Sequence, residues 1–588
     1  MINLAFLKQY IFTLLLLVNF HGFLLSQTNF SLSNPVCLDL MKGNFNSDSF
    51  SKRIVHPDAQ LRNYLVQQIN ADSLHQYLKG LISFRNRNTI SDDPSKPNEG
   101  IRGARAWIKS HLDRWAQQAN SVLIPCELEF DYLMCTKVRH TELFTLIPGT
   151  GSLKNELVIV EAHLDSRCED VCDSLCLAEG ADDNGSGSAL LMEMARVLSK
   201  VQLNRTMAII WITGEEQGLG GSRSFAAFCK ANNLVLKAVF NNDIVGGIEC
   251  GVTSSPPSCP GPNQFDSLRL RIFSSGTTNS MSKNLARMTR ILVEQNLSKV
   301  MVNAPQIDVM YGEDRTGRGS DHIPFREQGY TAIRFTSSYE HGDGNPSQAG
   351  YVDRQHSSRD ILGKDIDGDG ILDSLYVNFN YLKNNAIVNA LSIANASSTT
   401  LLPFILQVKP KTNSLDIKID NPQNATKYIY GIRKINNTYF DTIIITDQTQ
   451  ILIDGLSPTL YYVTACGVNQ EQWISMFGLE YSARVLNSIK QVEPTKPIEL
   501  LQNRPNPFDE LTLIPIIVND LSFIKEASMV VTSEDGRIIK QIKLDLTEGV
   551  NELFYNYSWN QFECGTYFYS LIINGTKIDT KKMEMVSY

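Results

Sequence analysis

The hydrophobic positions of residues 70–398 follow two alternating periods. Segments such as 100–119 (GIRGARAWIKSHLDRWAQQA) and 280–296 repeat apolar residues at helical spacing, whereas the runs between them are short and continuously apolar. Continuous apolar runs separated by helices are typical of a parallel sheet whose two faces are both covered. This part of the chain therefore predicts an α/β domain with a mostly parallel, doubly wound sheet.

The pattern changes after residue 398. Residues 399–486 lack a helical period and carry short β-type runs, such as YIYGIRKI (428–435) and LYYVTACGV (460–468). A linker with the sequence VEPTKP is predicted within residues 487–497, and residues 498–588 form another β-rich segment. We therefore predict two C-terminal all-β sandwich domains.

The N-terminus has the features of a targeting segment. Lys8 precedes the apolar run YIFTLLLLVNFHGFLLS (10–26), and polar residues follow it. This arrangement predicts a cleaved signal peptide over residues 1–26, followed by an N-terminal extension over residues 27–69. The alternative is an uncleaved anchor, but the run is short and is interrupted by His and Gly, so we expect no stable membrane span after cleavage.

Length, charge and cysteine content agree with an exported multidomain protein. A chain of 588 residues is too long for one core, and its net charge of −8 gives no basic surface of the kind that binds nucleic acid. The eleven cysteines suit an oxidising compartment. Candidate local bridges are Cys126–Cys135 and Cys250–Cys259. The three cysteines of CEDVCDSLC (168–176) predict a disulfide plus one free or remotely paired thiol, with a zinc knuckle as the alternative.

Ionisable residues follow the predicted strands at the points where the strands end. In a doubly wound sheet, ligands bind at this carboxyl edge. Taken singly, each acidic residue could be a helix cap or a solvated turn, and Asp183 is a candidate cap. The residues concerned are His163, Asp165, Asp182, Asp183, Glu215, Glu216 and Asp243.

Taken together, these residues predict a metal centre. About four carboxylates around one pocket raise one another's pKa, and two divalent cations would balance their charge. Imidazole and carboxylate form a ligand set suited to zinc, and one aspartate can bridge two ions roughly 3.5–4 Å apart, as in co-catalytic hydrolases. We therefore predict His163 and Asp182 as metal ligands, with Asp165 orienting His163.

Several motifs, in one order, resemble the zinc-dependent aminopeptidase family with two co-catalytic zincs. The resemblance covers roughly residues 70–398 and implies that family's α/β fold. The motifs are AHLDS (162–166), GADDNGSGSALLMEMARVL (180–198), TGEEQGLGGS (213–222), NNDIVGG (241–247) and RTGRGSDHIPFREQGYTAIRF (315–335).

The resemblance also implies a division of roles. His163 and Asp243 would hold one zinc, Glu216 and a late histidine would hold the other, and Asp182 would bridge the two. Glu215 would be the general base that activates a zinc-bound water. The cofactors expected are therefore two zinc ions.

Three histidines are candidates for the late ligand. His356 in DRQHSSRD, with Asp360 close behind, fits best the family's last ligand, which follows the AIRF-type strand. His341 in YEHGDG is the alternative. His322 in SDHIPF is expected to pack or to line the pocket.

A separate acidic segment, DIDGDGILD (365–373), interrupts the approach to the last predicted helix. Its alternating aspartates supply the oxygen ligands that calcium prefers, although it lacks a complete twelve-residue loop ending in glutamate. A solvated acidic turn is the equal alternative.

The two C-terminal segments carry resemblances of their own. GLSPTLYYVTACGVNQEQWIS (455–475) resembles the late strands of a fibronectin type III domain. Four later motifs resemble, in order, the C-terminal sorting domain of type IX secretion cargo, which implies the type IX machinery as a partner and a secreted or cell-surface location. These motifs are LLQNRPNPFDELTLIPI (500–516), SEDGRIIKQI (533–542), LTEGVNEL (546–553) and CGTYFYSLIINGTKIDTKKMEMV (564–586).

The function expected is that of a secreted metallo-aminopeptidase that acts on peptides or proteins. One alternative is a glutaminyl cyclase, a related fold with one zinc, but Gln355 stands where those enzymes place Trp before the last zinc ligand. A second alternative is a non-catalytic binding module of the same fold, although such a module would be expected to have lost ligands.

Overall fold

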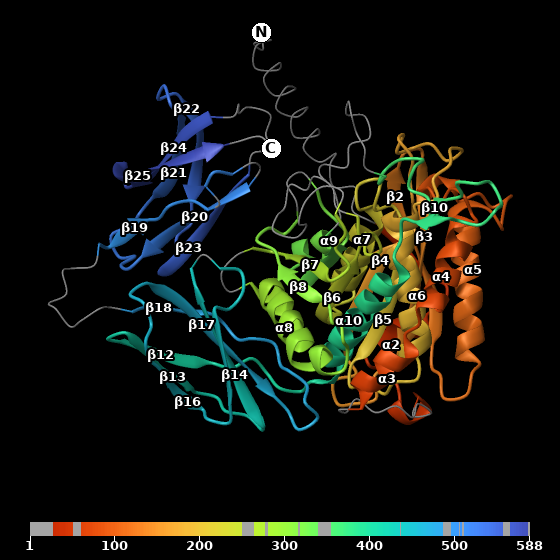
Figure 1. Cartoon of the computed structure of the whole chain (residues 1–588), viewed down its shortest axis with the longest axis horizontal. Helices are drawn as coiled ribbons and strands as arrows, with labels where there is room; N and C mark the ends of the chain where they lie inside the picture. The colour runs from red at the N-terminus through yellow and green to blue at the C-terminus, as the bar shows by residue number, and fades with distance from the viewer. Residues whose placement is uncertain are drawn as a thin grey trace, which may run out of the picture.

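The chain forms an α/β unit, coloured red to green in Figure 1, and two smaller all-β units that follow it. The computed structural model describes residues 28–50, 60–249, 264–276, 280–314, 318–338, 354–435, 437–485, 496–504, 506–508, 511–556 and 565–585. The predicted signal peptide and linker lie outside these residues, apart from the last two linker positions, 496 and 497. Within them, no helix is long and apolar enough to cross a membrane.

The α/β unit is built on one large sheet with the strand order β1-β2-β3-β5-β4-β6-β9-β7-β8. At its centre, β4 pairs in parallel with β5 and β6, and β6 pairs in parallel with β9. The strands β1 to β3 extend one edge in antiparallel fashion, and β7 joins β9 antiparallel. The strands are β1 (Thr28–Leu32), β2 (Ile124–Met134), β3 (Lys137–Ile147), β4 (Glu156–His163), β5 (Thr206–Ile212), β6 (Val235–Asn242), β7 (Arg269–Ser274), β8 (Gln306–Val309) and β9 (Ala332–Ser337).

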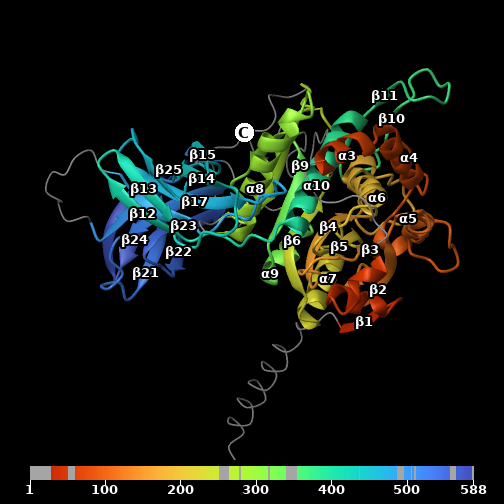
Figure 2. The ribbon, with the colours of Figure 1, turned by 90° about the horizontal axis from the view of Figure 1, so that it is seen from below.

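Helices cover both faces of this sheet, as Figure 2 shows from below. One face packs mainly on α4, α5, α6, α8 and α10, and the other packs on α2, α7 and α9. The central strands β4 and β5 are buried along almost their whole length, which explains their continuous apolar runs. The predicted α/β class with a large central sheet is confirmed. The helices are α2 (Val36–Met41), α3 (Leu61–Gln68), α4 (Ala71–Ile82), α5 (Gly100–Ala116), α6 (Gly187–Leu198), α7 (Gly220–Ala231), α8 (Met281–Asn296), α9 (His322–Glu327) and α10 (Phe379–Ser398), with short helical turns η1 (Ser47–Phe50), η2 (Thr89–Ser91), η3 (Ala181–Ser186) and η4 (Leu297–Lys299).

The C-terminal part of the chain is all-β, as predicted. Its strands form two sheets in each unit, with the orders β12-β13-β16 and β15-β14-β17-β18, then β19-β20-β23 and β22-β21-β24-β25. The assignments to a fibronectin type III domain and a sorting domain stay predictions. The strands are β12 (Leu406–Lys411), β13 (Ser414–Ile419), β14 (Lys427–Lys434), β15 (Thr442–Thr446), β16 (Gln450–Ile453), β17 (Leu460–Val468), β18 (Tyr481–Arg484), β19 (Ile498–Leu500), β20 (Leu511–Val518), β21 (Ala527–Ser533), β22 (Ile538–Leu544), β23 (Gly549–Asn556), β24 (Gly565–Ile573) and β25 (Thr576–Met585), and a hairpin of β10 (Gly363–Lys364) and β11 (Ser374–Leu375) precedes α10.

The first all-β unit is joined to the α/β unit by a buried interface. Trp473 and Phe477 belong to the same hydrophobic core as α8 and α10. Glu480 Oε1 forms ion pairs with Arg287 Nη1 of α8, at 3.0 Å, and with Arg433 Nε of β14, at 2.6 Å. Burial alone would raise the pKa of Glu480, but the two guanidinium groups lower it to about 2.

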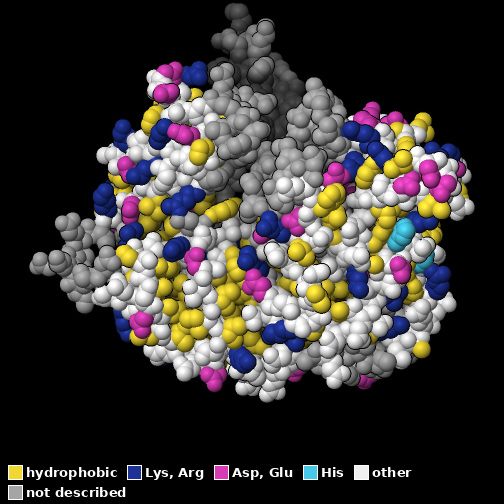
Figure 3. All heavy atoms as spheres, in the orientation of Figure 1, with side chains coloured by type: hydrophobic (Ala, Val, Ile, Leu, Met, Phe, Trp, Pro, Cys, Tyr) yellow, Lys and Arg dark blue, Asp and Glu magenta, His cyan; other side chains and the backbone are white. Residues whose placement is uncertain are grey.

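On the face of the molecule shown in Figure 3, basic and acidic side chains are interspersed.

Two disulfides fix the loop that leads to the site, and they correct one predicted bridge. Cys168 pairs with Cys176, and Cys172 pairs with Cys135, so the prediction of one local disulfide and one remotely paired thiol is confirmed. Cys126 is free and buried instead of pairing with Cys135. Cys126 lies in the extended strand β2 and Cys135 follows its end, so the nine residue steps between them span roughly 30 Å, far beyond the reach of a disulfide. The predicted Cys250–Cys259 pair lies outside the described residues.

Candidate metal centre

The candidate site lies at the carboxyl edge of the central parallel strands. His163 is the last residue of β4, and its side chain is 1% exposed. Glu215 and Glu216 follow β5, and Asp243 follows β6. Because β4, β5 and β6 are adjacent and parallel, they deliver these side chains to one place.

Two groups of ligand-type atoms share Asp183. In the first group, His163 Nε2 lies 3.2 Å from Asp183 Oδ1 and 3.4 Å from Asp243 Oδ1. In the second, His356 Nε2 lies 3.3 Å from Asp183 Oδ2 and 3.5 Å from Glu216 Oε2. Within each group the three ligand atoms lie within 4.8 Å of one another. The two oxygens of Asp183 therefore face two neighbouring half-sites.

The structure corrects the predicted bridge from Asp182 to Asp183. The carboxylate of Asp182 turns away from the cluster and accepts the backbone N–H groups of Gly246 and Gly247, both at 2.9 Å. The backbone is not helical at Asp183 and Asn184, and this kink directs the two neighbouring aspartates differently. Asp183 is therefore a ligand candidate and not the helix cap that was predicted.

Asp360 holds this kinked segment in place. Its carboxylate accepts the backbone N–H of Asp182 at 3.1 Å and that of Asp183 at 2.9 Å. The turn that presents Asp183 is thus anchored from the segment that follows His356.

Asp165, which was predicted to orient His163, does so mainly through its main chain. His163 Nδ1 lies 3.0 Å from the backbone carbonyl oxygen of Asp165, so the main chain orients the imidazole. The Asp165 carboxylate lies farther from Nδ1, at 3.7 Å, and accepts the backbone N–H groups of Gly214, Glu215 and Glu216 at 2.9, 3.3 and 3.1 Å. Its side chain therefore fixes the turn that carries both glutamates.

The electrostatics of the cluster favour bound cations. Burial raises the pKa of Glu215 and of Glu216 well above the ordinary value, and neighbouring acidic groups add to the effect. Burial opposes the charging of His163, but its hydrogen bonds to Asp183 and Asp243 raise its pKa well above the ordinary value. Buried carboxylates that face one another in this way are costly unless a cation balances them.

The donor set fits two zinc ions. Each half-site offers one imidazole nitrogen, one terminal carboxylate and one oxygen of the shared Asp183, and these are donors that zinc accepts. Oε1 of Glu216 is buried and has no hydrogen-bond partner among the described residues. A buried carboxylate oxygen without a partner is expected where that oxygen binds a metal ion.

The other histidines and the acidic loop lie apart from this cluster. His322 is buried and its Nε2 lies 2.9 Å from the backbone carbonyl of Glu313, so it packs as predicted. His341 lies outside the described residues. Asp365, Asp367 and Asp373 offer oxygens within 4.8 Å of one another and are exposed. A solvated acidic turn has the same features, so calcium at residues 365–373 stays a prediction.

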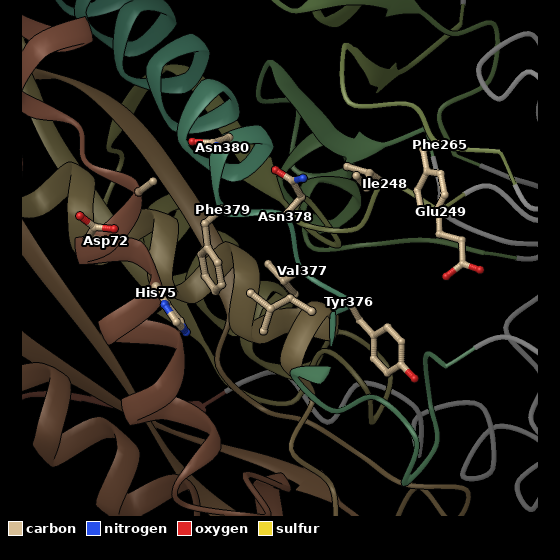
Figure 4. A pocket seen from close by; sticks show the side chains of 12 residues that line it. Asp72, His75, Ile248, Glu249, Phe265, Tyr376, Val377, Asn378, Phe379 and Asn380 are labelled. Atoms are coloured by element: carbon tan, nitrogen blue, oxygen red, sulfur yellow. The ribbon is translucent and has the colours of Figure 1, made fainter. Parts of the chain in front are cut away.

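A pocket of about 370 Å³ lies between the start of α4, residues 248–249 and residues 375–380 (Figure 4). Phe379 and His75 line one end of this pocket, and Tyr376 and Glu249 line the other. Arg354 pairs with Glu249 at 2.7 Å and its guanidinium lies 3.7 Å from the centre of the Tyr376 ring. Arg354 thus ties the wall of the pocket to the backbone two residues before His356.

The α/β unit is similar to a family of known proteins. Residues 144–377, which contain every member of the cluster, match the model of Peptidase family M28. The match covers less than half of the chain, so the similarity to this family is that of the α/β unit.

The chain is also similar to curated proteins described as probable zinc metalloproteases. A probable zinc metalloprotease of Pyrenophora teres is 31% identical over 299 residues, which are 48% of this chain and 60% of the relative. Another from Leptosphaeria maculans is 28% identical over 350 residues, covering 58% of this chain and 77% of the relative. The chain thus spans about 60% of the first relative's length.

Among solved structures, the chain is similar to two enzymes at lower identity. The LapA aminopeptidase of Legionella pneumophila is 20% identical, with a TM-score of 0.39 over 58% of this chain and 75% of that chain. A glutaminyl cyclase of Fimbriiglobus ruber is 16% identical, with a TM-score of 0.38 over 55% of this chain and 95% of that chain.

Proposed function

We propose that this protein is a secreted aminopeptidase that removes N-terminal residues from peptides and uses two zinc ions. The observation that carries the proposal is Asp183, whose two carboxylate oxygens face two complete half-sites. His163 and Asp243 would hold one ion, and His356 and Glu216 would hold the other. When bound, the zinc pair would polarise the scissile carbonyl and acidify a water.

Glu215 is the general base of this proposal. Its carboxylate makes no hydrogen bond or ion pair within the described part of the chain, yet it interacts electrostatically with His163. A carboxylate with a raised pKa is suited to taking a proton from the attacking water and passing it to the leaving amine. Asp165 supports this step because it holds the backbone of Glu215 and Glu216.

The two alternatives are less well supported. A glutaminyl cyclase would use one zinc, but this chain supplies the donors of two half-sites, and Gln355 precedes His356 where Trp would be expected. A non-catalytic module would have no need for a complete ligand set together with Glu215.

The function is tested with peptides that begin with Leu, Lys or Gln and with N-acetylated twins of each. Only the free peptides should lose their first residue. A chelator should abolish the reaction and added zinc should restore it. Cleavage of the blocked twins would indicate an endopeptidase, and loss of ammonia from the Gln peptide alone would indicate a cyclase.

We also propose export through the signal peptide and the C-terminal unit, residues 498–588. The disulfides Cys135–Cys172 and Cys168–Cys176 support an oxidising destination. In a host that has the type IX machinery, deletion of residues 498–588 should leave an active enzyme inside the cell. Efficient release of the truncated enzyme into the medium would refute the sorting role.

A further inference from the structure

Within the described residues, the two oxygens of Asp243 have different partners: Ser320 and Arg334 hold Oδ2, and Oδ1 faces the ligand His163. Oδ2 accepts a hydrogen bond from Ser320 Oγ at 2.8 Å and lies 3.0 Å from Arg334 Nη2. Oδ1 is turned towards His163 Nε2, at 3.4 Å. The rotation of this carboxylate is therefore fixed before any metal binds.

Arg334 is itself held rigidly. Its side chain is 1% exposed, and Nη1 donates to both oxygens of Asp314 at 2.8 Å. The strand β9, which carries Arg334, pairs in parallel with β6, so that Arg334 lies beside Asn241. Asn241 in turn donates to Ser320 Oγ at 2.5 Å. Both groups that hold Asp243 Oδ2 are thus fixed by buried partners.

The carboxylate of Glu216, the terminal ligand of the other half-site, is not held in this way by the described residues. The Glu216 side chain is 2% exposed, and its nearest cation in the described structure besides His356 is Arg167, whose Nη1 lies 4.0 Å from Oε2. Oε1 has no hydrogen-bond partner among the described residues. Glu216 can therefore present either oxygen to a metal, whereas Asp243 presents one.

We propose that Arg334 is a positioning residue that aims Asp243 Oδ1 at the metal of the His163 half-site and leaves the His356 half-site unaffected. The inference rests on the proposed zinc centre. Residues that hold a ligand in place usually change metal affinity by about 10–100-fold when they are replaced. Arg334 is suited to this role because its planar guanidinium directs N–H donors of different nitrogens at two carboxylates in a fixed geometry, whereas the donors of lysine all rotate about one nitrogen.

The test is zinc binding to the metal-free protein in competition with a chromophoric chelator, which needs no turnover. The wild-type protein should bind two zinc ions. Arg334→Lys keeps the positive charge but loses the planar set of N–H donors. The zinc affinity of the His163 half-site should therefore fall about 10–100-fold, while the His356 half-site keeps its affinity. In a His163→Ala background, which retains only the His356 half-site, Arg334→Lys should cause no further loss.

Arg271→Lys is the matched control. Arg271 is fully buried in the neighbouring strand β7 and donates twice to the backbone carbonyl of Ser337, at 3.0 and 2.8 Å. Its replacement should lower the thermal stability without changing either zinc affinity. If Arg334→Lys does not fold, Ser320→Ala removes the other bond to the same oxygen and should weaken the same single site by a smaller factor.

Two results would overturn the inference. Equal weakening of both sites would make Arg334 a general structural residue, and unchanged affinity at both sites would remove its role in positioning Asp243. Failure of the wild-type protein to bind zinc would instead reject the proposed metal centre itself.

Discussion

Replacement of Glu215 by alanine should slow turnover by about 10²–10⁴ while both zinc ions stay bound. Asp165 holds the turn through backbone N–H groups, so the loss of the Glu215 side chain leaves Glu216 in place. The loss corresponds to about 3–5 kcal/mol of transition-state stabilisation, with little change in KM. Steady-state kinetics and elemental analysis of the same preparation measure both effects.

Glu216→Ala is the matched control for this experiment. It removes a ligand of the His356 half-site, so zinc content should fall and excess zinc should partly restore activity. The opposite pattern, with Glu215→Ala losing zinc and recovering on its addition, would exchange the two roles. Wild-type turnover of Glu215→Ala would end the proposed mechanism.

The second large effect is expected at Asp183, which is part of both half-sites. Asp183→Ala should weaken both zinc ions together and abolish activity, because each His–carboxylate group then lacks its shared oxygen. Asp182→Asn should keep both zinc ions and lose about 10–100-fold in turnover at most, since Asp182 binds backbone N–H groups.

The two variants form a matched pair because Asp182 and Asp183 are adjacent in the chain, yet their carboxylates contact different groups. Zinc binding and thermal unfolding should be measured on both variants. A normal zinc content in Asp183→Ala together with loss in Asp182→Asn would restore Asp182 as the bridge and contradict the observed geometry.

The architecture was predictable because it depends on patterns that extend over many residues. The continuous apolar runs at β4 and β5 are a direct consequence of burial on both faces of the sheet, and the loss of helical period after residue 398 marks the all-β units. The predicted Cys126–Cys135 bridge was wrong because a hairpin pattern does not give the length of its strands: Cys126 lies near the start of β2, and Cys135 follows its other end.

The sequence predicted most residues of the metal site correctly, but it did not predict which aspartate lies between the two half-sites. The order of strands brings His163, Glu216 and Asp243 to one edge, and this follows from the sequence pattern. The choice between Asp182 and Asp183 depends on a local kink and on the two N–H groups of Gly246 and Gly247. The glycine pair after Asp243 was the only signal in the sequence for such an N–H pair.

Arg334 and Ser320 were not predicted to contact the site. Arg334 lies inside an apolar strand motif, and its ion pair with Asp243 depends on the parallel pairing of β9 with β6. A charged residue within a buried strand indicates that a buried partner exists, but the sequence does not identify that partner.

The most direct test of the account is mass spectrometry of one peptide with a free N-terminus incubated beside its N-acetylated twin, with zinc-replete and zinc-depleted enzyme. The account predicts stepwise loss of residues from the N-terminus of the free peptide by the zinc-replete enzyme, and no change in the twin or without zinc. Internal cleavage of the twin, or an unchanged free peptide at two bound zinc ions per chain, would contradict it.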